Sequence, residues 1–92
     1  GITKGNHYHH SKNEKYLVVS GTCLTKLRKV GDDKIISYKT SGKKLEIIDI
    51  PPGYTHNITN VGEEDSVTLM WANELYDIEN PDTIFLKVEE EK

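Results

Sequence analysis

Short β-prone runs, separated by turn residues at regular intervals, constrain the fold of this chain more than any other feature. Runs rich in Ile, Val, Tyr and Thr occupy residues 16–19, 35–38, 45–50, 66–71 and 84–88. Turn-forming clusters such as Pro51-Pro52-Gly53 and Asn80-Pro81-Asp82 stand between them, and such clusters end strands. No stretch sustains a helical apolar period, apart from a short turn near Ala72 to Tyr76. The spacing therefore predicts an all-β barrel or sandwich.

Size and composition favour a single domain over residues 1–92. A chain of 92 residues is near the lower limit for a self-sufficient hydrophobic core, so a second domain does not fit. No apolar stretch approaches the length of a membrane span, and the N-terminus has no signal-like character. The lone Cys23 excludes an intramolecular disulfide framework. We therefore expect a domain outside the membrane, in the reducing cytoplasm.

The charge pattern bears on the partners. The net charge is −3, and Lys and Arg are scattered along the chain, whereas binding to a phosphate backbone requires a concentrated basic face. Nucleic acid is therefore not an expected partner. A negatively charged small molecule is still compatible with this charge pattern as a ligand, because the local charge of a pocket matters more than the net charge of the chain. The residues that could supply positive charge are Lys12, Lys15, Lys26 and Arg28.

Four side chains are candidate metal ligands. His7 and His9 are two residues apart, which places them on the same face of an extended strand. Glu14 opens the next β-prone run, so we expect the chain to turn and return beside the first strand. The turn at 51–53 can aim the following strand, and with it His56, at the same place. Three imidazoles and a carboxylate suit zinc, iron, manganese or nickel.

The start of the chain suggests that residues 1–92 are a fragment of a longer protein. The first candidate ligand is already at position 7 and no initiator Met is present, so hardly any strand precedes the site. A barrel normally needs a strand to cover that edge. The alternative is that a partner chain supplies the strand, which would make a homodimer.

Both segments that carry these ligands resemble the two motifs of the cupin family. The first motif is similar to His7-x-His9, which is followed after four residues by Glu14 and after six more by Gly21. The second motif is similar to Pro51-x-Gly53, which is followed after two residues by His56 and after three more by Asn60. The resemblance implies a jelly-roll barrel, that is, a double-stranded β-helix, with a metal ion held at its mouth by His7, His9, Glu14 and His56.

Two positions depart from the family pattern. Leu45 stands where the second motif usually opens with a Gly, so the hairpin before that strand is expected to differ in shape. The neighbouring His10 also competes with His9 for the role of second imidazole. Strand alternation favours His7 and His9 as the pair that points inward.

Longer stretches are similar to the C-terminal cupin domain of bifunctional bacterial enzymes of capsular polysaccharide synthesis. These stretches are residues 5–15, 49–56, 71–74 and 80–83. The resemblance implies that a zinc-dependent cupin epimerises C3 of a UDP-4-keto-6-deoxy-N-acetylhexosamine, a precursor of N-acetyl-L-fucosamine. It further implies that an N-terminal domain, absent here, reduces the epimerised sugar with NADPH.

Epimerisation needs a base and an acid near the metal, and the sequence leaves both unassigned. The candidates are His10, Tyr8, Tyr16 and Tyr54, and Lys12 and Lys26 are weaker candidates. Two other functions stay open at this point, because the cupin barrel hosts many activities. One is a non-catalytic, metal-binding cupin that binds a sugar nucleotide or mediates dimerisation, and the other is an iron-dependent oxygenase.

Overall fold

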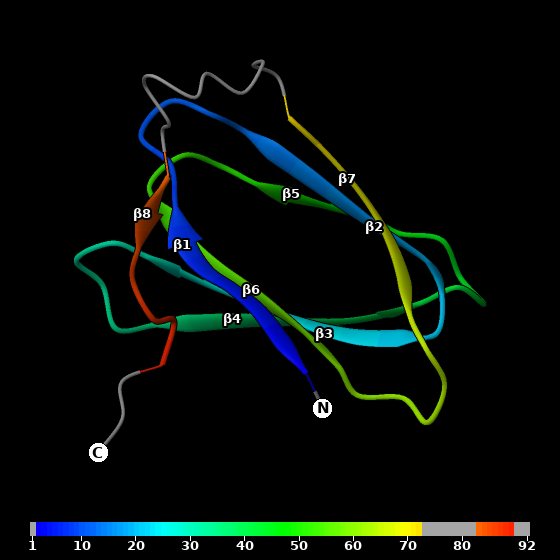
Figure 1. Ribbon diagram of the computed structural model, residues 1–92. Helices are drawn as coiled ribbons and strands as arrows, with labels where there is room; N and C mark the ends of the chain where they lie inside the picture. The colour runs from blue at the N-terminus through cyan, green and yellow to red at the C-terminus, as the bar shows by residue number, and fades with distance from the viewer. Residues whose placement is uncertain (1, 73–82, 90–92) are drawn as a thin grey trace.

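The computed structural model describes residues 2–72 and 83–89, and their regular structure is entirely β-strand (Figure 1). The strands in these ranges are β1 (Thr3–Tyr8), β2 (Glu14–Ser20), β3 (Thr22–Lys29), β4 (Ile35–Ser41), β5 (Ile47–Ile50), β6 (Tyr54–Asn60), β7 (Val67–Ala72) and β8 (Ile84–Phe85). Within the same ranges, no helix is long and apolar enough to cross a membrane.

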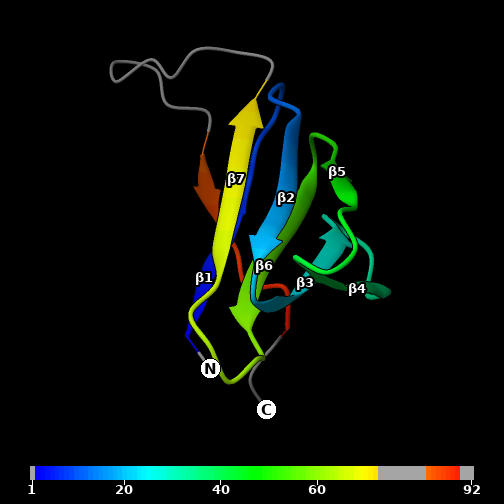
Figure 2. The same cartoon turned by 90° about the vertical axis from the view of Figure 1, so that its right-hand side faces the viewer.

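The strands form two antiparallel sheets that face each other (Figure 2). The larger sheet has the order β4-β3-β6-β1-β8, and the smaller one has the order β5-β2-β7. The chain crosses repeatedly between the two sheets, so that hydrogen-bonded neighbours are often distant in sequence. This arrangement is a jelly roll, and it confirms the predicted all-β, cupin-type fold.

Each of the five predicted runs overlaps a strand, but the sequence reading missed β3. In β3 the buried residues Cys23, Thr25 and Leu27 alternate with more exposed neighbours, so no continuous apolar run marks the strand. The predicted run 84–88 contributes only the two residues of β8. Ala72 ends β7 rather than opening a helical turn, and residues 73–76 lie outside the described part of the chain.

The expected pairing of the strand opened by Glu14 with the first strand was wrong. β1 pairs with β6 and β8, whereas β2 pairs with β5 and β7 in the other sheet. The short connection between β1 and β2 therefore crosses the space between the sheets. This crossing lets each strand turn an apolar or ligand-bearing face inward, which a hairpin within one sheet would not achieve. β8 also covers the edge of β1 that seemed to lack a neighbour.

The hydrophobic core lies between the sheets and adjoins the candidate ligands, since Leu27 of the core pairs with His56. Tyr16, Leu27, Ile48 and Ile50 form a buried cluster, and Tyr54 and Ile58 pack against it. In β2 and β5 the buried side chains alternate with more exposed ones, as expected for strands with one inward face. The core thus supports the inward faces from which the ligands project.

Candidate metal centre

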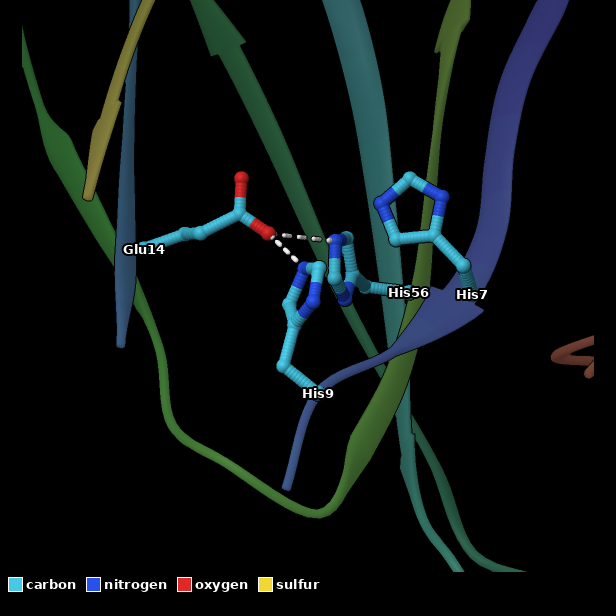
Figure 3. A group of neighbouring side chains, drawn as sticks. All are labelled: His7, His9, Glu14 and His56. Atoms are coloured by element: carbon cyan, nitrogen blue, oxygen red, sulfur yellow. Dashed lines mark hydrogen bonds and ion pairs between the residues drawn. The ribbon is translucent and has the colours of Figure 1, made fainter. Parts of the chain in front are cut away.

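His7, His9, Glu14 and His56 come together between the two sheets (Figure 3). Each offers one ligand atom, and these atoms all lie within 4.8 Å of one another. Glu14 reaches from the smaller sheet, while His7 and His56 stand opposite each other on β1 and β6 of the larger one. The two sheets therefore contribute jointly to the cluster, and the predicted ligand set occupies a single place in space.

His56 is the most deeply buried member of the cluster, with no measurable exposure. Its Nδ1 atom lies 3.1 Å from the carbonyl oxygen of Tyr54. Its Nε2 atom is buried, makes no hydrogen bond within the described residues, and lies 3.5 Å from Oε1 of Glu14. A buried ring nitrogen without a partner is costly unless something binds it.

His9 lies just beyond the last residue of β1, yet it is buried and faces the same centre. Its Nε2 atom is in contact with Oε1 of Glu14. On the other side of the ring, Nδ1 lies 3.4 Å from Oγ1 of Thr83. A partner on the second ring nitrogen is the usual way in which a metal-binding histidine is oriented, and sequence reasoning did not identify Thr83 in this role.

The electrostatics of the cluster favour a charged carboxylate beside a neutral imidazole. Burial would raise the pKa of Glu14, but the adjacent imidazoles of His56 and His9 outweigh it and lower the pKa to about 2. The pKa of His7 is lowered by burial and by repulsion from His56 and His9. Near neutral pH, Glu14 is therefore an anion and His7 an unprotonated donor, which are the forms that bind a metal.

The donor set fits a divalent transition metal. Three imidazole nitrogens and one carboxylate oxygen match the ligand preferences of zinc, and iron, manganese and nickel accept the same set. The buried Nε2 of His56 has no hydrogen bond among the described residues and lies beside the ionised Glu14, an arrangement that a shared cation would satisfy.

Of the four acid and base candidates, two lie on the side of the ligands. Tyr16 is buried in the core, and its ring centroid is 5.7 Å from that of His56. Burial and the charge of Glu14 raise the pKa of Tyr16 well above its ordinary value, so the phenol stays protonated. Tyr54 lies two residues before His56, on the same face of β6, and packs against the core.

Tyr8 and His10 lie elsewhere. Tyr8 follows His7 on β1 and therefore faces the opposite side of the strand. The exposed His10 packs its ring edge-on against Tyr8, with ring centroids 5.6 Å apart. The structure thus leaves this pair outside the ligand cluster.

The basic residues are largely occupied away from the cluster. Lys15 forms an ion pair with Asp49 and Lys26 with Glu89. Arg28 donates hydrogen bonds to the carbonyl oxygens of residues 32, 87 and 88. Lys12 is the exception, because its charge contributes to the lowered pKa of His7.

Comparison with known proteins gives consistent matches along the chain. A family model described as the polysaccharide biosynthesis C-terminal domain matches residues 1–84. A relative from Pseudomonas aeruginosa, named UDP-2-acetamido-2,6-beta-L-arabino-hexul-4-ose reductase, is 49% identical over 90 residues, which are 98% of this chain and 24% of the relative.

Solved structures also match most of this chain. A crystal structure of CapF from Staphylococcus aureus, described as a capsular polysaccharide assembling protein, is 62% identical with a TM-score of 0.92, covering 95% of this chain and 25% of that chain. The sugar 3,4-ketoisomerase QdtA from Thermoanaerobacterium thermosaccharolyticum, solved with TDP, shares the fold at 23% identity and a TM-score of 0.73, covering 90% of this chain and 56% of that chain. This chain spans about a quarter of the length of the first two relatives.

Proposed function

Because this chain belongs to the family of polysaccharide biosynthesis C-terminal domains, we propose that it is a metal-dependent sugar-nucleotide epimerase of capsule synthesis. Its reaction would be the C3 epimerisation of a UDP-4-keto-6-deoxy-N-acetylhexosamine, ahead of reduction toward N-acetyl-L-fucosamine. The observation that carries the proposal is the convergence of His7, His9, Glu14 and His56 on one point.

The names of the relatives support the substrate class. The Pseudomonas relative is named as a reductase of a UDP-linked 4-keto sugar, and CapF as an assembling protein of capsular polysaccharide. A 4-keto group acidifies the hydrogen on each neighbouring carbon, C3 and C5, so C3 is one of the two positions open to epimerisation. We further propose that the chain acts beside an NADPH-dependent reductase domain of the same protein, in the cytoplasm. The buried, unpaired Cys23 agrees with a reducing compartment.

We propose zinc as the metal, held by the three histidines and Glu14. A bound zinc ion would supply Lewis-acid stabilisation of the charge that develops on a keto oxygen when the adjacent carbon loses its proton. The protein's own residues contribute the rest. A hydrogen bond with the carbonyl oxygen of Tyr54 orients the ring of His56, and Tyr16 offers a protonated phenol beside that ring. Of the candidates, Tyr16 and Tyr54 are therefore the ones we expect to handle protons.

We also propose that the chain forms a homodimer through the outward face of the smaller sheet. Ile47, Leu17 and Leu69 lie side by side across β5, β2 and β7. Ile47 is 58% exposed and Leu69 is 52% exposed, and Trp71 extends the apolar surface along β7. An outward face with aligned apolar side chains is typical of a protein interface.

The proposed activity is tested by following solvent hydrogen at C3. The chain, loaded with zinc, is incubated with the UDP-4-keto sugar in deuterated water, and NMR records deuterium at C3. We expect incorporation that a chelator abolishes and that His56→Ala lacks. Bound sugar nucleotide without any exchange would instead support the non-catalytic cupin. Iron in the purified protein, with oxygen consumed on adding substrate, would support the oxygenase.

A further inference from the structure

The first ligand strand contains a β-bulge immediately before His7. Gly5 pairs with Asn57 and His7 pairs with His56, so two steps along β1 match one step along β6. Asn6 is the extra residue. It has a φ of +60°, and Gly5 before it has a φ of +107°. Such a conformation is rare for residues other than glycine, and asparagine is among those that tolerate it.

The bulge decides which way His7 points. If the ladder continued from Gly5 and Asn57 without interruption, Asn6 would oppose His56 and His7 would oppose Thr55. His56 faces the interior, whereas Thr55 donates its hydroxyl to the carbonyl of Leu86, on the other side of the sheet. A shift of one residue moves a side chain to the opposite face. The extra residue therefore turns His7 inward.

The side chain and backbone of Asn6 hold the bulge in place. Its Oδ1 atom accepts hydrogen bonds from Nδ2 of Asn57 at 3.0 Å and from the backbone N–H of Val88 at 3.3 Å. Its carbonyl oxygen accepts from the N–H of Leu86 at 2.8 Å. Asn57 and Val88 are both buried. The bulge is thus tied to β6 on one side and to the segment after β8 on the other.

Gly5 closes the bulge tightly against the strand that carries the other ligand. A Cβ atom at this position would lie 2.9 Å from the carbonyl oxygen of His56 and 3.1 Å from the Cα of Asn57. Both contacts are with backbone, which has little room to move. Any larger residue would therefore push β1 away from β6 beside His56.

From this geometry we infer that Asn6 is a positioning residue of the metal centre: the bulge that it forms and locks presents His7 to the metal. The inference rests on the metal centre proposed above. It adds a residue that lies outside the ligand set and acts only through His7. Partners that orient metal ligands commonly contribute tenfold to hundredfold in metal affinity.

Three variants of the chain separate this role from a general loss of stability. Asn6→Val strongly disfavours the positive φ and removes the carboxamide, so we expect zinc affinity to fall by about tenfold to hundredfold. Deletion of Asn6 removes the extra residue, so His7 again falls opposite His56 in an uninterrupted ladder. We expect the deletion to bind zinc more tightly than Asn6→Val. Asn60→Ala is the matched control, because within residues 2–72 and 83–89 the carboxamide of Asn60 bonds only the turn at residues 62 and 64.

Zinc affinity is measured by competition with a chromophoric chelator, and circular dichroism and melting report folding. Asn60→Ala should lower the melting temperature and leave zinc affinity within twofold. A folded Asn6→Val that binds zinc as tightly as the wild type would overturn the inference, as would a deletion that binds no better than Asn6→Val.

A readout without metal distinguishes this inference from the metal centre itself. Cross-strand NOEs should connect His7 with His56 in the wild type and with Thr55 in Asn6→Val. A wild type that binds no zinc would refute the proposed centre, yet these NOEs would still show whether Asn6 sets the face of His7. NOEs unchanged in Asn6→Val would refute the role of Asn6 alone.

Discussion

The Nδ1 atom of His56 lies 3.1 Å from the carbonyl oxygen of Tyr54, two residues earlier on β6. A carbonyl oxygen only accepts hydrogen bonds, so Nδ1 carries the proton and Nε2 is left with a free lone pair. That lone pair is buried and lies toward Glu14. The backbone of β6 thereby selects the ring form that binds a metal before any metal arrives.

Loss of this imidazole should remove most of the metal affinity. His56→Ala takes away the most buried donor, and we expect zinc affinity to fall more than the roughly hundredfold typical of losing an orienting partner. Competition with a chromophoric chelator measures the change. The control is His10→Ala, which alters an exposed histidine outside the cluster. Equal losses in the two variants would contradict the assignment of His56 as a ligand.

Metal removal should destabilise the folded chain. A ligand present at a hundred times its dissociation constant stabilises by about 2.7 kcal/mol, which corresponds to about 10 °C or more in melting temperature for a domain of this size. We expect EDTA to lower the melting temperature of the zinc-loaded chain by this order. The same treatment should leave His56→Ala unchanged. A wild-type melt that ignores EDTA would show that folding and metal binding are not linked.

The metal-free chain should lose stability in acid through Glu14. The pKa of Glu14 falls from its ordinary 4.5 to about 2 on folding, so the unfolded chain binds the proton more readily. The stabilisation is complete above pH 4.5 and disappears as the pH falls from 4.5 to about 2. Urea unfolding across this range, with chelator present, should show a steeper decline for the wild type than for Glu14→Gln. Parallel curves would refute the lowered pKa.

Proton transfer should depend on the tyrosines that share the face of the ligands. Tyr16→Phe removes the hydroxyl and keeps the ring that packs in the core, so we expect the exchange rate at C3 to fall by about a hundredfold or more while the fold persists. Tyr8→Phe is the control, because Tyr8 lies on the opposite face of β1. Unchanged exchange in Tyr16→Phe would leave Tyr54 as the candidate on this face.

The outward face of the smaller sheet should be required for dimerisation. Leu69 is 52% exposed and lies in register with Leu17, so Leu69→Glu would place a charge in the middle of the proposed interface at little cost to the monomer. We expect light scattering to report a dimer for the wild type and a monomer for this variant. Lys39→Glu, on the larger sheet, is the matched control. A wild-type monomer at high concentration would refute the interface.

The sequence predicted that the candidate ligands meet, because the spacing of His7, His9 and Glu14 and the turn before His56 are local features with local geometric consequences. Strand partners are not local, so the expected pairing of the first two ligand strands was wrong. β3 escaped notice because Lys26 and Arg28 interrupt its apolar residues, although burial on one face needs only every second residue. The sequence carries one sign of the bulge, the turn-prone pair Gly5-Asn6 inside a strand. The role of this pair becomes clear only from the pairing of β1 with β6.

The hydrogen bonds between Asn6 and the segment after β8 have a consequence for when the bulge can form during synthesis. The N–H of Val88 that meets the carboxamide of Asn6 is 82 positions further along the chain. A chain emerging from the ribosome thus exposes His7 and His9 long before their lasting neighbours exist. The bulge is therefore locked only once residue 88 has been made, although all four candidate ligands are already present at residue 56.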